Sequence, residues 1–331
     1  MNGYTTGNVD ASAISFLEGT ISALNTAYAA GSALGNGISG LGNETVTIDD
    51  TAVTASDLNT LNDNTTGNIV ATTATSFTGT ISDLNTLYAA AASSGNGVSG
   101  LGSEAVTVTD SSVSASDLNT LNGNTSYNIT VNATAISGSL SAVSTLYGNK
   151  AADSQAATNG FTGLGGEAIT LSDTGSIAAS TLLTVAQANT SGTVDASNAG
   201  TITGTAEQII NSYADSTITE ASNVALTVNS GTASLTQARS LDGLTTGVVT
   251  ATIADTAVSD LVGSAPLLDA NSNNAFTITI GTDDASVSAA NLNTLDGLTT
   301  VAINAGNVTT ITSSTLAVSY THLRAHETEL H

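Results

Sequence analysis

Aspartates recur in the predicted turns of this chain, and their carboxylates are the groups best suited to chemistry. These turn positions are Asp49, Asp50, Asp110, Asp173, Asp242, Asp283, Asp284 and Asp296. Calcium prefers such hard oxygen ligands, and turns at regular spacing can supply several of them. The candidate calcium ligands are Asp49, Asp50, Asp110, Asp173, Asp283 and Asp284. The β-roll nonapeptide and the EF-hand loop are missing, so we expect no cofactor unless these turns bind calcium.

Two adjacent acid pairs, Asp49–Asp50 and Asp283–Asp284, suggest a second chemistry. Facing carboxylates would suit a polysaccharide-acting β-helix enzyme, although adjacent acids in a turn are more often solvated turn formers. A cleft would have to interrupt the repeat, and 148–161 is the most irregular stretch. The chain has no cysteine, and its three histidines all lie at the C-terminal end, which excludes nucleophile–histidine systems from the repeat. We expect no enzymatic activity.

Threonine pairs on predicted strands resemble the flat ladders of ice-binding β-solenoids. The pairs are Thr45/Thr47, Thr107/Thr109 and Thr277/Thr279. Equivalent places in the intervening coils hold Asn8/Asp10, Asn68/Val70 and Thr193/Asp195. The ladder is therefore predicted to be broken, and threonine is ordinary on an exposed strand face. Ice binding is an alternative function.

A repeat of about sixty residues positions all these groups, because Tyr4–Asp63 returns almost unchanged at Asn64–Gly123. Each copy divides into two similar halves, so the unit is about thirty residues and roughly eleven units fit the chain. That length suits one coil of a parallel β-solenoid with one short helix per coil, or of a leucine-rich-like α/β solenoid. We expect residues 1–317 to form one continuous β-rich solenoid.

Within a unit the pattern predicts a strand, a turn, a second short strand and one or two turns of helix. Val46 and Ile48 alternate with threonines, which indicates a strand with one buried face. Leu58 and Leu61 would face the core. Helix-opening capping boxes are predicted at Thr54–Asp57, Ser114–Asp117 and Ser234–Gln237, and left-handed helix ends at Gly123, Gly243 and Gly297.

Glycine-rich loops separate the halves of the first three copies. They contain Gly40-Leu41-Gly42, Gly100-Leu101-Gly102 and Gly163-Leu164-Gly165. They lack the lysine and the surrounding pattern of a phosphate-binding loop, so we interpret them as plain turns.

The composition excludes several partners. The net charge is −24 with three lysines and arginines, so the surface repels nucleic acids and anionic membranes. No apolar run reaches the roughly 18 residues that a membrane helix needs, and no signal peptide is visible. We expect neither nucleic-acid binding nor membrane insertion.

The C-terminal segment 318–331 differs from the repeat, because it holds His322, His326, His331 and Arg324. It resembles the translation of a sequencing-library adapter, and we expect a non-native or disordered tail. Neither end of the repeat shows an atypical capping unit, so we expect a fragment of a longer chain.

The recurring phrase Ala55-Ser56-Asp57-Leu58-Asn59-Thr60-Leu61, with Thr245-Thr246-Gly247-Val248-Val249, resembles the tandem repeats of very large predicted surface or secreted proteins of marine bacteria, cyanobacteria among them. This resemblance implies an extracellular or cell-surface role that is structural or adhesive. Its partners would be cell-surface glycans, other surface proteins or the rest of its own chain. Calcium-dependent adhesin repeats are the first alternative.

Overall fold

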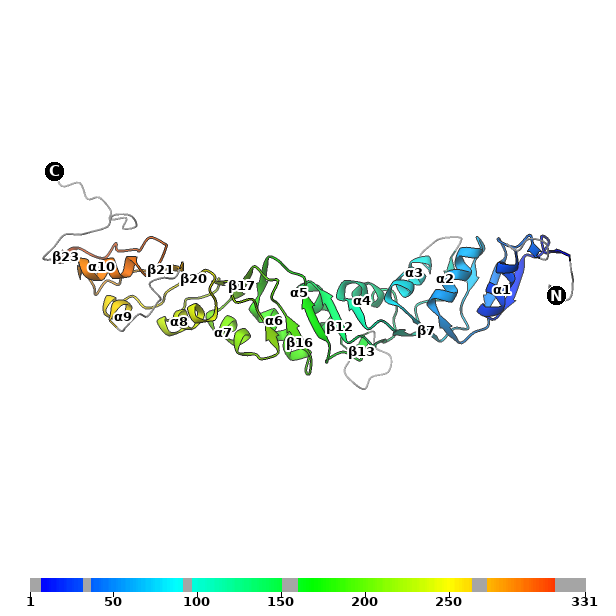
Figure 1. The fold of residues 1–331 in the computed structure, drawn as a ribbon, viewed down its shortest axis with the longest axis horizontal. Coiled ribbons are helices and arrows are strands. Elements are labelled where there is room, and N and C mark those ends of the chain that lie inside the picture. The colour runs from blue at the N-terminus through cyan, green and yellow to red at the C-terminus, as the bar shows by residue number, and fades with distance from the viewer. Residues whose placement is uncertain (1–6, 32–36, 92–96, 151–159, 264–272, 313–331) are drawn as a thin grey trace, which may run out of the picture. The chain divides into compact units, whose positions relative to one another are not determined.

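The computed structural model describes residues 7–31, 37–91, 97–150, 160–263 and 273–312. The chain packs as two compact units, Met1–Ala168 (unit 1) and Ile169–His331 (unit 2). Helices alternate with short strands along both units (Figure 1). The predicted tail and residues 151–159 of the irregular stretch lie outside the described residues.

The described part of unit 1 holds five helices, each preceded by two or three short strands. Its elements are β1 (Val9–Asp10), β2 (Phe16–Gly19), α1 (Ile21–Gly31), β3 (Ile38–Ser39), β4 (Thr45–Ile48), β5 (Ala52–Thr54), α2 (Ala55–Asn64), β6 (Ile69–Val70), β7 (Ser76–Gly79), α3 (Ile81–Ala91), β8 (Val98–Ser99), β9 (Ala105–Val108), β10 (Ser112–Ser114), α4 (Ala115–Asn122), β11 (Ile129–Val131), β12 (Ala135–Gly138), α5 (Leu140–Gly148) and β13 (Phe161–Thr162).

The described part of unit 2 continues the alternation. Its elements are β14 (Ala168–Leu171), which starts at the boundary, β15 (Ser176–Ala178), α6 (Ala179–Ala188), β16 (Thr193–Asp195), β17 (Thr201–Gly204), α7 (Ala206–Ala214), β18 (Ile218–Thr219), β19 (Ala225–Val228), α8 (Leu235–Leu244), β20 (Val249–Thr252), α9 (Val258–Val262), β21 (Ala275–Thr277), β22 (Ser286–Ser288), α10 (Ala289–Asp296) and β23 (Thr310–Thr312).

The sheets are parallel, and each strand pairs with strands of neighbouring coils. Unit 1 contains the orders β2-β4-β6-β8 and β5-β7-β9-β11-β13, and unit 2 contains β15-β17-β19-β20-β21. In the first sheet Leu17 lies opposite Val46, which lies opposite Ile69. Parallel strands joined by helical crossovers make an α/β fold, which is compatible with a repeat solenoid.

A short turn between two consecutive strands takes the chain from one sheet to the next. β4 belongs to the first sheet of unit 1 and β5 to the second, and only residues 49–51 separate them. β9 and β10 repeat this arrangement. The prediction of a strand, a turn and a second short strand before the helix is confirmed here.

The core consists mainly of alanine, valine, leucine and isoleucine side chains from both kinds of element, and Phe77, Phe161 and Phe276 are also fully buried. Val46 and Ile48 are fully buried on β4, and Leu58 and Leu61 are fully buried on α2, as predicted. Most of the described helices are longer than the predicted one or two turns: α1 has 11 residues and packs along α2, whereas α9 has only five. Helices and strands therefore both contribute to the core.

The predicted helix ends are partly wrong. Thr54 and Ser114 make no side-chain cap hydrogen bond, and the Ser114 hydroxyl instead contacts the Ser116 hydroxyl at 2.7 Å. Ser234 does form the predicted box with Gln237. Gly123 and Gly297 have φ of −70° and −72°, because the helical backbone continues through them, and Gly243 lies inside α8.

Candidate functional site

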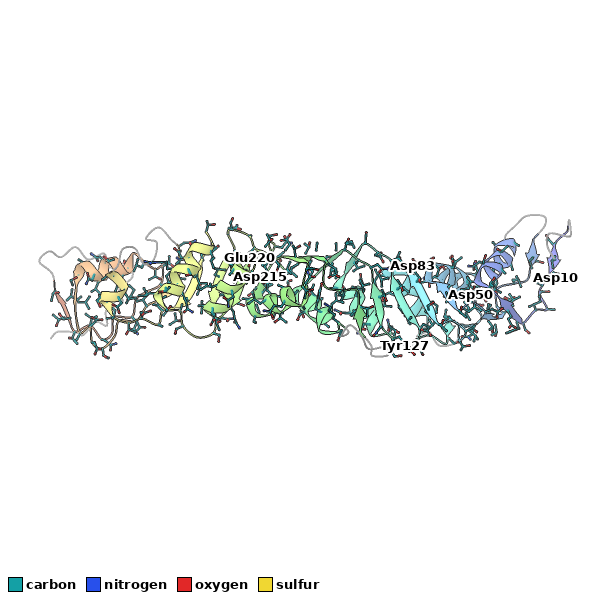
Figure 2. The ribbon with its side chains drawn as sticks, turned by 90° about the horizontal axis from the view of Figure 1, so that it is seen from below. Asp10, Asp50, Asp83, Tyr127, Asp215 and Glu220 are labelled. Carbon is teal, nitrogen blue, oxygen red and sulfur yellow. The ribbon has the colours of Figure 1, made fainter. Side chains whose placement is uncertain are left out.

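Four aspartates that come after strands each contact the N-terminus of the helix in the preceding repeat unit. Each accepts a hydrogen bond at Oδ2 from the first backbone N–H of that helix. The pairs are Asp50 with Ile21 N at 2.7 Å, Asp110 with Ile81 N at 2.7 Å, Asp255 with Leu235 N at 2.9 Å and Asp284 with Val258 N at 2.8 Å. A helix leaves its first amides unpaired and carries partial positive charge there, so a carboxylate stabilises it. Asp50 is labelled in Figure 2.

The other candidate calcium ligands are separate from these contacts. Asp49 and Asp283 are exposed beside Asp50 and Asp284, and Asp173 is half-buried two residues after β14. Asp242 accepts a hydrogen bond from the Asn274 side chain, and Asp296 is half-buried in α10. Among the described residues, no three or more histidine, cysteine or acidic side chains are grouped so that they could hold a metal ion.

A buried glutamate that sequence reasoning missed follows each Gly-Leu-Gly loop. Glu44 has no exposed surface, although carboxylates are rarely buried without partners. Both of its oxygens accept from Gly42 N, at 3.1 and 2.8 Å, and Oε2 also accepts from the Tyr28 hydroxyl at 2.9 Å. The loop and the end of α1 thus enclose one carboxylate.

The next copy repeats this contact. Glu104 is 3% exposed, and its Oε2 accepts from Gly102 N at 2.8 Å, Ser103 N at 3.0 Å and the Tyr88 hydroxyl at 3.4 Å. The aromatic ring of Tyr88 meets Phe77 edge to face at 6.4 Å, which fixes the phenol in the core.

The third copy repeats it again. Glu167 is 2% exposed and accepts from Gly165 N, Gly166 N and the Tyr147 hydroxyl, the last at 2.5 Å. We call the three sites of Glu44, Glu104 and Glu167 the glutamate nests, because successive backbone N–H groups surround an anion in each.

Glycine is required in these loops. Gly42, Gly102 and Gly165 have φ of +142°, +118° and +131°, which other residues rarely adopt. Gly40 also lies so close to the preceding coil that an added Cβ would be 2.6 Å from the Ser12 backbone. The loops predicted as plain turns are therefore carboxylate-binding loops. The recurrence of Gly-Leu-Gly-x-Glu was the available signal.

The nest of Glu44 favours the charged form of the acid. Burial raises the pKa of Glu44, but hydrogen bonds from Gly42 N, from other backbone amides and from Tyr28 outweigh this effect, so the pKa lies below its ordinary value. Burial, aided by the Glu44 carboxylate, raises the pKa of Tyr28 to about 12. The tyrosine therefore remains a neutral donor at physiological pH.

The corresponding loop of unit 2 has the same length but a different order of residues. Between β18 and β19 it reads Glu220-Ala221-Ser222-Asn223-Val224, where the loop between β3 and β4 reads Gly40-Leu41-Gly42-Asn43-Glu44. The glutamate has moved from the last position to the first, and the glycines are gone. Val224, 3% exposed, stands in the place of Glu44 and cannot accept a hydrogen bond through its side chain.

This change leaves two buried polar atoms without partners. Tyr213 is the eighth residue of α7, as Tyr28 is of α1, but its hydroxyl has no hydrogen-bond partner, and neither has Oε1 of Glu220. Burial raises the pKa of Glu220 to about 7, and nearby Asp215 contributes to the rise (Figure 2). Burial and the Glu220 charge also raise the pKa of Tyr213.

Asparagines join the helices of unit 1. Each is the fifth residue of its helix and donates through Nδ2 to a backbone carbonyl of the next helix. The pairs are Asn25 with Asp57 O, Asn59 with Asp83 O, Asn85 with Asp117 O and Asn119 with Ala142 O, at 2.9 to 3.2 Å. In unit 2 the fifth residues of α6 and α7 are Leu183 and Ile210, which have no such donor.

The threonine ladder is broken in one sheet and continuous in another. Thr47 lies between Glu18 and Val70, so Val70 interrupts the row as predicted, but its other neighbour is Glu18 and not Asp10, which pairs with Ser39. In the second sheet of unit 1 the register aligns an unbroken row across five strands, Thr54, Thr78, Thr107, Thr130 and Thr162. Their side chains are exposed or half-exposed.

Comparison of the chain with protein-family models, with curated proteins and with solved structures finds no match in any of the three. No helix in the described ranges is long and apolar enough to cross a membrane. A function for this chain therefore has to be inferred from its own repeat and from the geometry of these contacts.

Proposed function

We propose that this chain is a structural segment of an extracellular or cell-surface repeat protein, in which stacked solenoid coils act as a spacer and as a repeated binding surface. The observation that carries the proposal is the recurrence of one internal contact. The same tyrosine, glutamate and glycine loop recurs in three successive copies. A unique catalytic site would require a departure from the repeat, whereas identical joints favour regular length.

The acids support the same proposal because the structure already uses them. Asp50, Asp110 and Asp284 bind helix amides, and the nest glutamates bind loop amides. Outward-facing groups that repeat at each coil would let many weak contacts with glycans or surface proteins act together. The calcium-dependent form of this function remains the alternative to be tested.

The test is to lengthen the chain by one and then two extra copies of residues 64–123, inserted after residue 123, and to measure small-angle X-ray scattering. A spacer gains the same increment in maximum dimension from each copy, while its cross-sectional radius stays constant. Growth of the cross-section, or unequal increments, would contradict the proposal.

The unbroken threonine row supports ice binding as a second candidate, because hydroxyls on adjacent parallel strands repeat at about 4.8 Å. Thr107→Lys would interrupt the row at its centre, and Thr47→Lys is the matched control in a row that is already broken. Ice binding predicts thermal hysteresis that Thr107→Lys abolishes and Thr47→Lys leaves intact. A wild-type chain without hysteresis would exclude it.

A further inference from the structure

The Tyr213–Glu220 region of unit 2 departs from the repeat in a way that stability alone does not explain. In the glutamate nests every buried carboxylate has backbone N–H donors and a phenol. In unit 2, Oε1 of Glu220 in the β18–β19 loop and the hydroxyl of Tyr213 on α7 are buried without partners, so the Glu220 carboxylate has only its own backbone N–H and Ser212 as hydrogen-bonding groups. An ionised carboxylate is costly to bury without donors, whereas a protonated one is not.

From this geometry we propose that Glu220 is a proton-operated latch. Protonated, it closes the β18–β19 loop against the end of α7, and ionised, it opens this corner of unit 2. The inference is independent of the proposed function, since it concerns one coil rather than the array.

The surrounding charges favour this behaviour. The titratable groups on the elements packed around Glu220 are Glu207 and Tyr213 on α7, Asp215 after α7, Asp195 on β16, and Arg239 and Asp242 on α8. Asp215 disfavours the ionised form of Glu220. The backbone N–H of Glu220 and the buried Ser212 hydroxyl favour the ionised form, but Ser212 has one hydrogen, which it donates to Ile209 O at 2.8 Å.

The closed and open states of the Glu220 loop bind different numbers of protons between about pH 4.5 and pH 7. The pKa of Glu220 is about 7 in the closed state against an ordinary value of 4.5 when the carboxylate is free in solvent. Between these values the closed form holds a proton that the open form releases, so opening becomes more favourable as pH rises. The opening equilibrium should increase about ten- to a hundredfold between pH 5 and pH 8 after allowance for partial exposure.

The test is hydrogen–deuterium exchange of the full chain at pH 5 and pH 8, corrected for the intrinsic exchange rate and followed by mass spectrometry in peptides covering 212–228. In the wild type, protection should fall by about ten- to a hundredfold at pH 8. Glu220→Gln, which keeps the shape and removes the titration, should hold protection within about threefold.

Glu207→Gln is the matched control, because Glu207 is an exposed acid on α7, the helix against which the Glu220 loop closes, and its loss changes the net charge equally. It should leave the wild-type fall intact. The proposal would be overturned if protection in the wild type did not decrease at pH 8, or if the decrease persisted in Glu220→Gln. Equal effects of the two substitutions on protection would also overturn it.

Discussion

The Tyr28–Glu44 contact of unit 1 and the Tyr213–Glu220 region of unit 2 use the same residue types at the same element ends, with opposite results. In unit 1 the glutamate comes last in its loop, and the glycines before it aim their amides at the carboxylate. In unit 2 it comes first, no glycine precedes it within the loop, and its pKa rises instead of falling. The order of residues in a five-residue loop thus decides whether a buried acid stabilises its coil as an anion.

Removing the charge of a nest glutamate is the largest expected effect. In Glu104→Gln the backbone N–H groups of Gly102 and Ser103 face a neutral side-chain amide. The NH₂ group of that amide is itself a donor and cannot accept their hydrogen bonds. The substitution should destabilise its coil by about 3 kcal/mol, because hydrogen bonds to charged groups are strong and unpaired buried donors are costly. Glu220→Gln should instead stabilise its coil at pH 8. Local free energies from native-state hydrogen exchange measure both. Equal losses at the two sites would break the comparison.

Transplanting the nest into unit 2 should reverse its behaviour. The triple variant Glu220→Gly, Ser222→Gly and Val224→Glu gives the loop the residue order of unit 1 and offers the Tyr213 hydroxyl an acceptor. We expect a gain of about 2 kcal/mol at pH 7 and the loss of the pH dependence above pH 5. Val224→Glu alone is the control and should destabilise, because it buries a carboxylate without the glycine amides. A triple variant no more stable than this single one would contradict the role of the glycines.

Acidification should act on the two regions with opposite signs. The pKa of Glu44 is lower folded than unfolded, so its contribution is present above the ordinary value of 4.5 and is lost as pH falls through the folded value. The pKa of Glu220 is higher folded than unfolded, so its coil gains stability as pH falls from about 7 towards 4.5, by about 1–2 kcal/mol after allowance for solvent screening. Exchange of peptides from the two regions, from about pH 2 to pH 8 and corrected for the intrinsic rate, checks both. Parallel profiles would show that overall charge, not these sites, sets the response.

The tyrosine hydroxyls give the smallest effect and a direct contrast. Tyr28→Phe should cost about 1–2 kcal/mol, because it removes a donor to a buried carboxylate. Tyr213→Phe should be neutral or slightly stabilising, because it removes a buried hydroxyl without a partner. Chemical denaturation of the two variants beside the wild type measures the difference. A loss in Tyr213→Phe as large as in Tyr28→Phe would mean that Tyr213 does have a partner.

The repeat and the alternation of its apolar residues were sufficient to predict the local fold. The strand at Val46 and Ile48 and the core positions Leu58 and Leu61 followed from periodicity alone. The threonine row did not, because the sequence repeats most clearly at an offset of sixty residues, whereas each strand pairs with a strand of the next, shorter unit. Thr107 therefore has Thr78 and Thr130 as neighbours rather than Thr47.

The site was harder to predict because its partners lie far apart in the sequence. Asp50 and Ile21 N are 29 residues apart, and nothing in the spacing shows which polar group of the next coil an acid will reach. The nests also depend on the φ of Gly42, which the sequence permits but does not specify. The displaced position of Glu220 can be recognised only when the loop between β18 and β19 is aligned with the loop between β3 and β4.

The central proposal is that Asp50, Asp110, Asp255 and Asp284 serve to bind backbone amides of the preceding repeat rather than calcium. Thermal unfolding of the full chain, followed by circular dichroism in millimolar calcium and in EDTA, tests it most directly, because a ligand that binds only the folded state raises Tm. We predict the same Tm in both conditions. A large rise in calcium that Asp50→Asn or Asp110→Asn removes would contradict the account and favour a calcium-dependent adhesin.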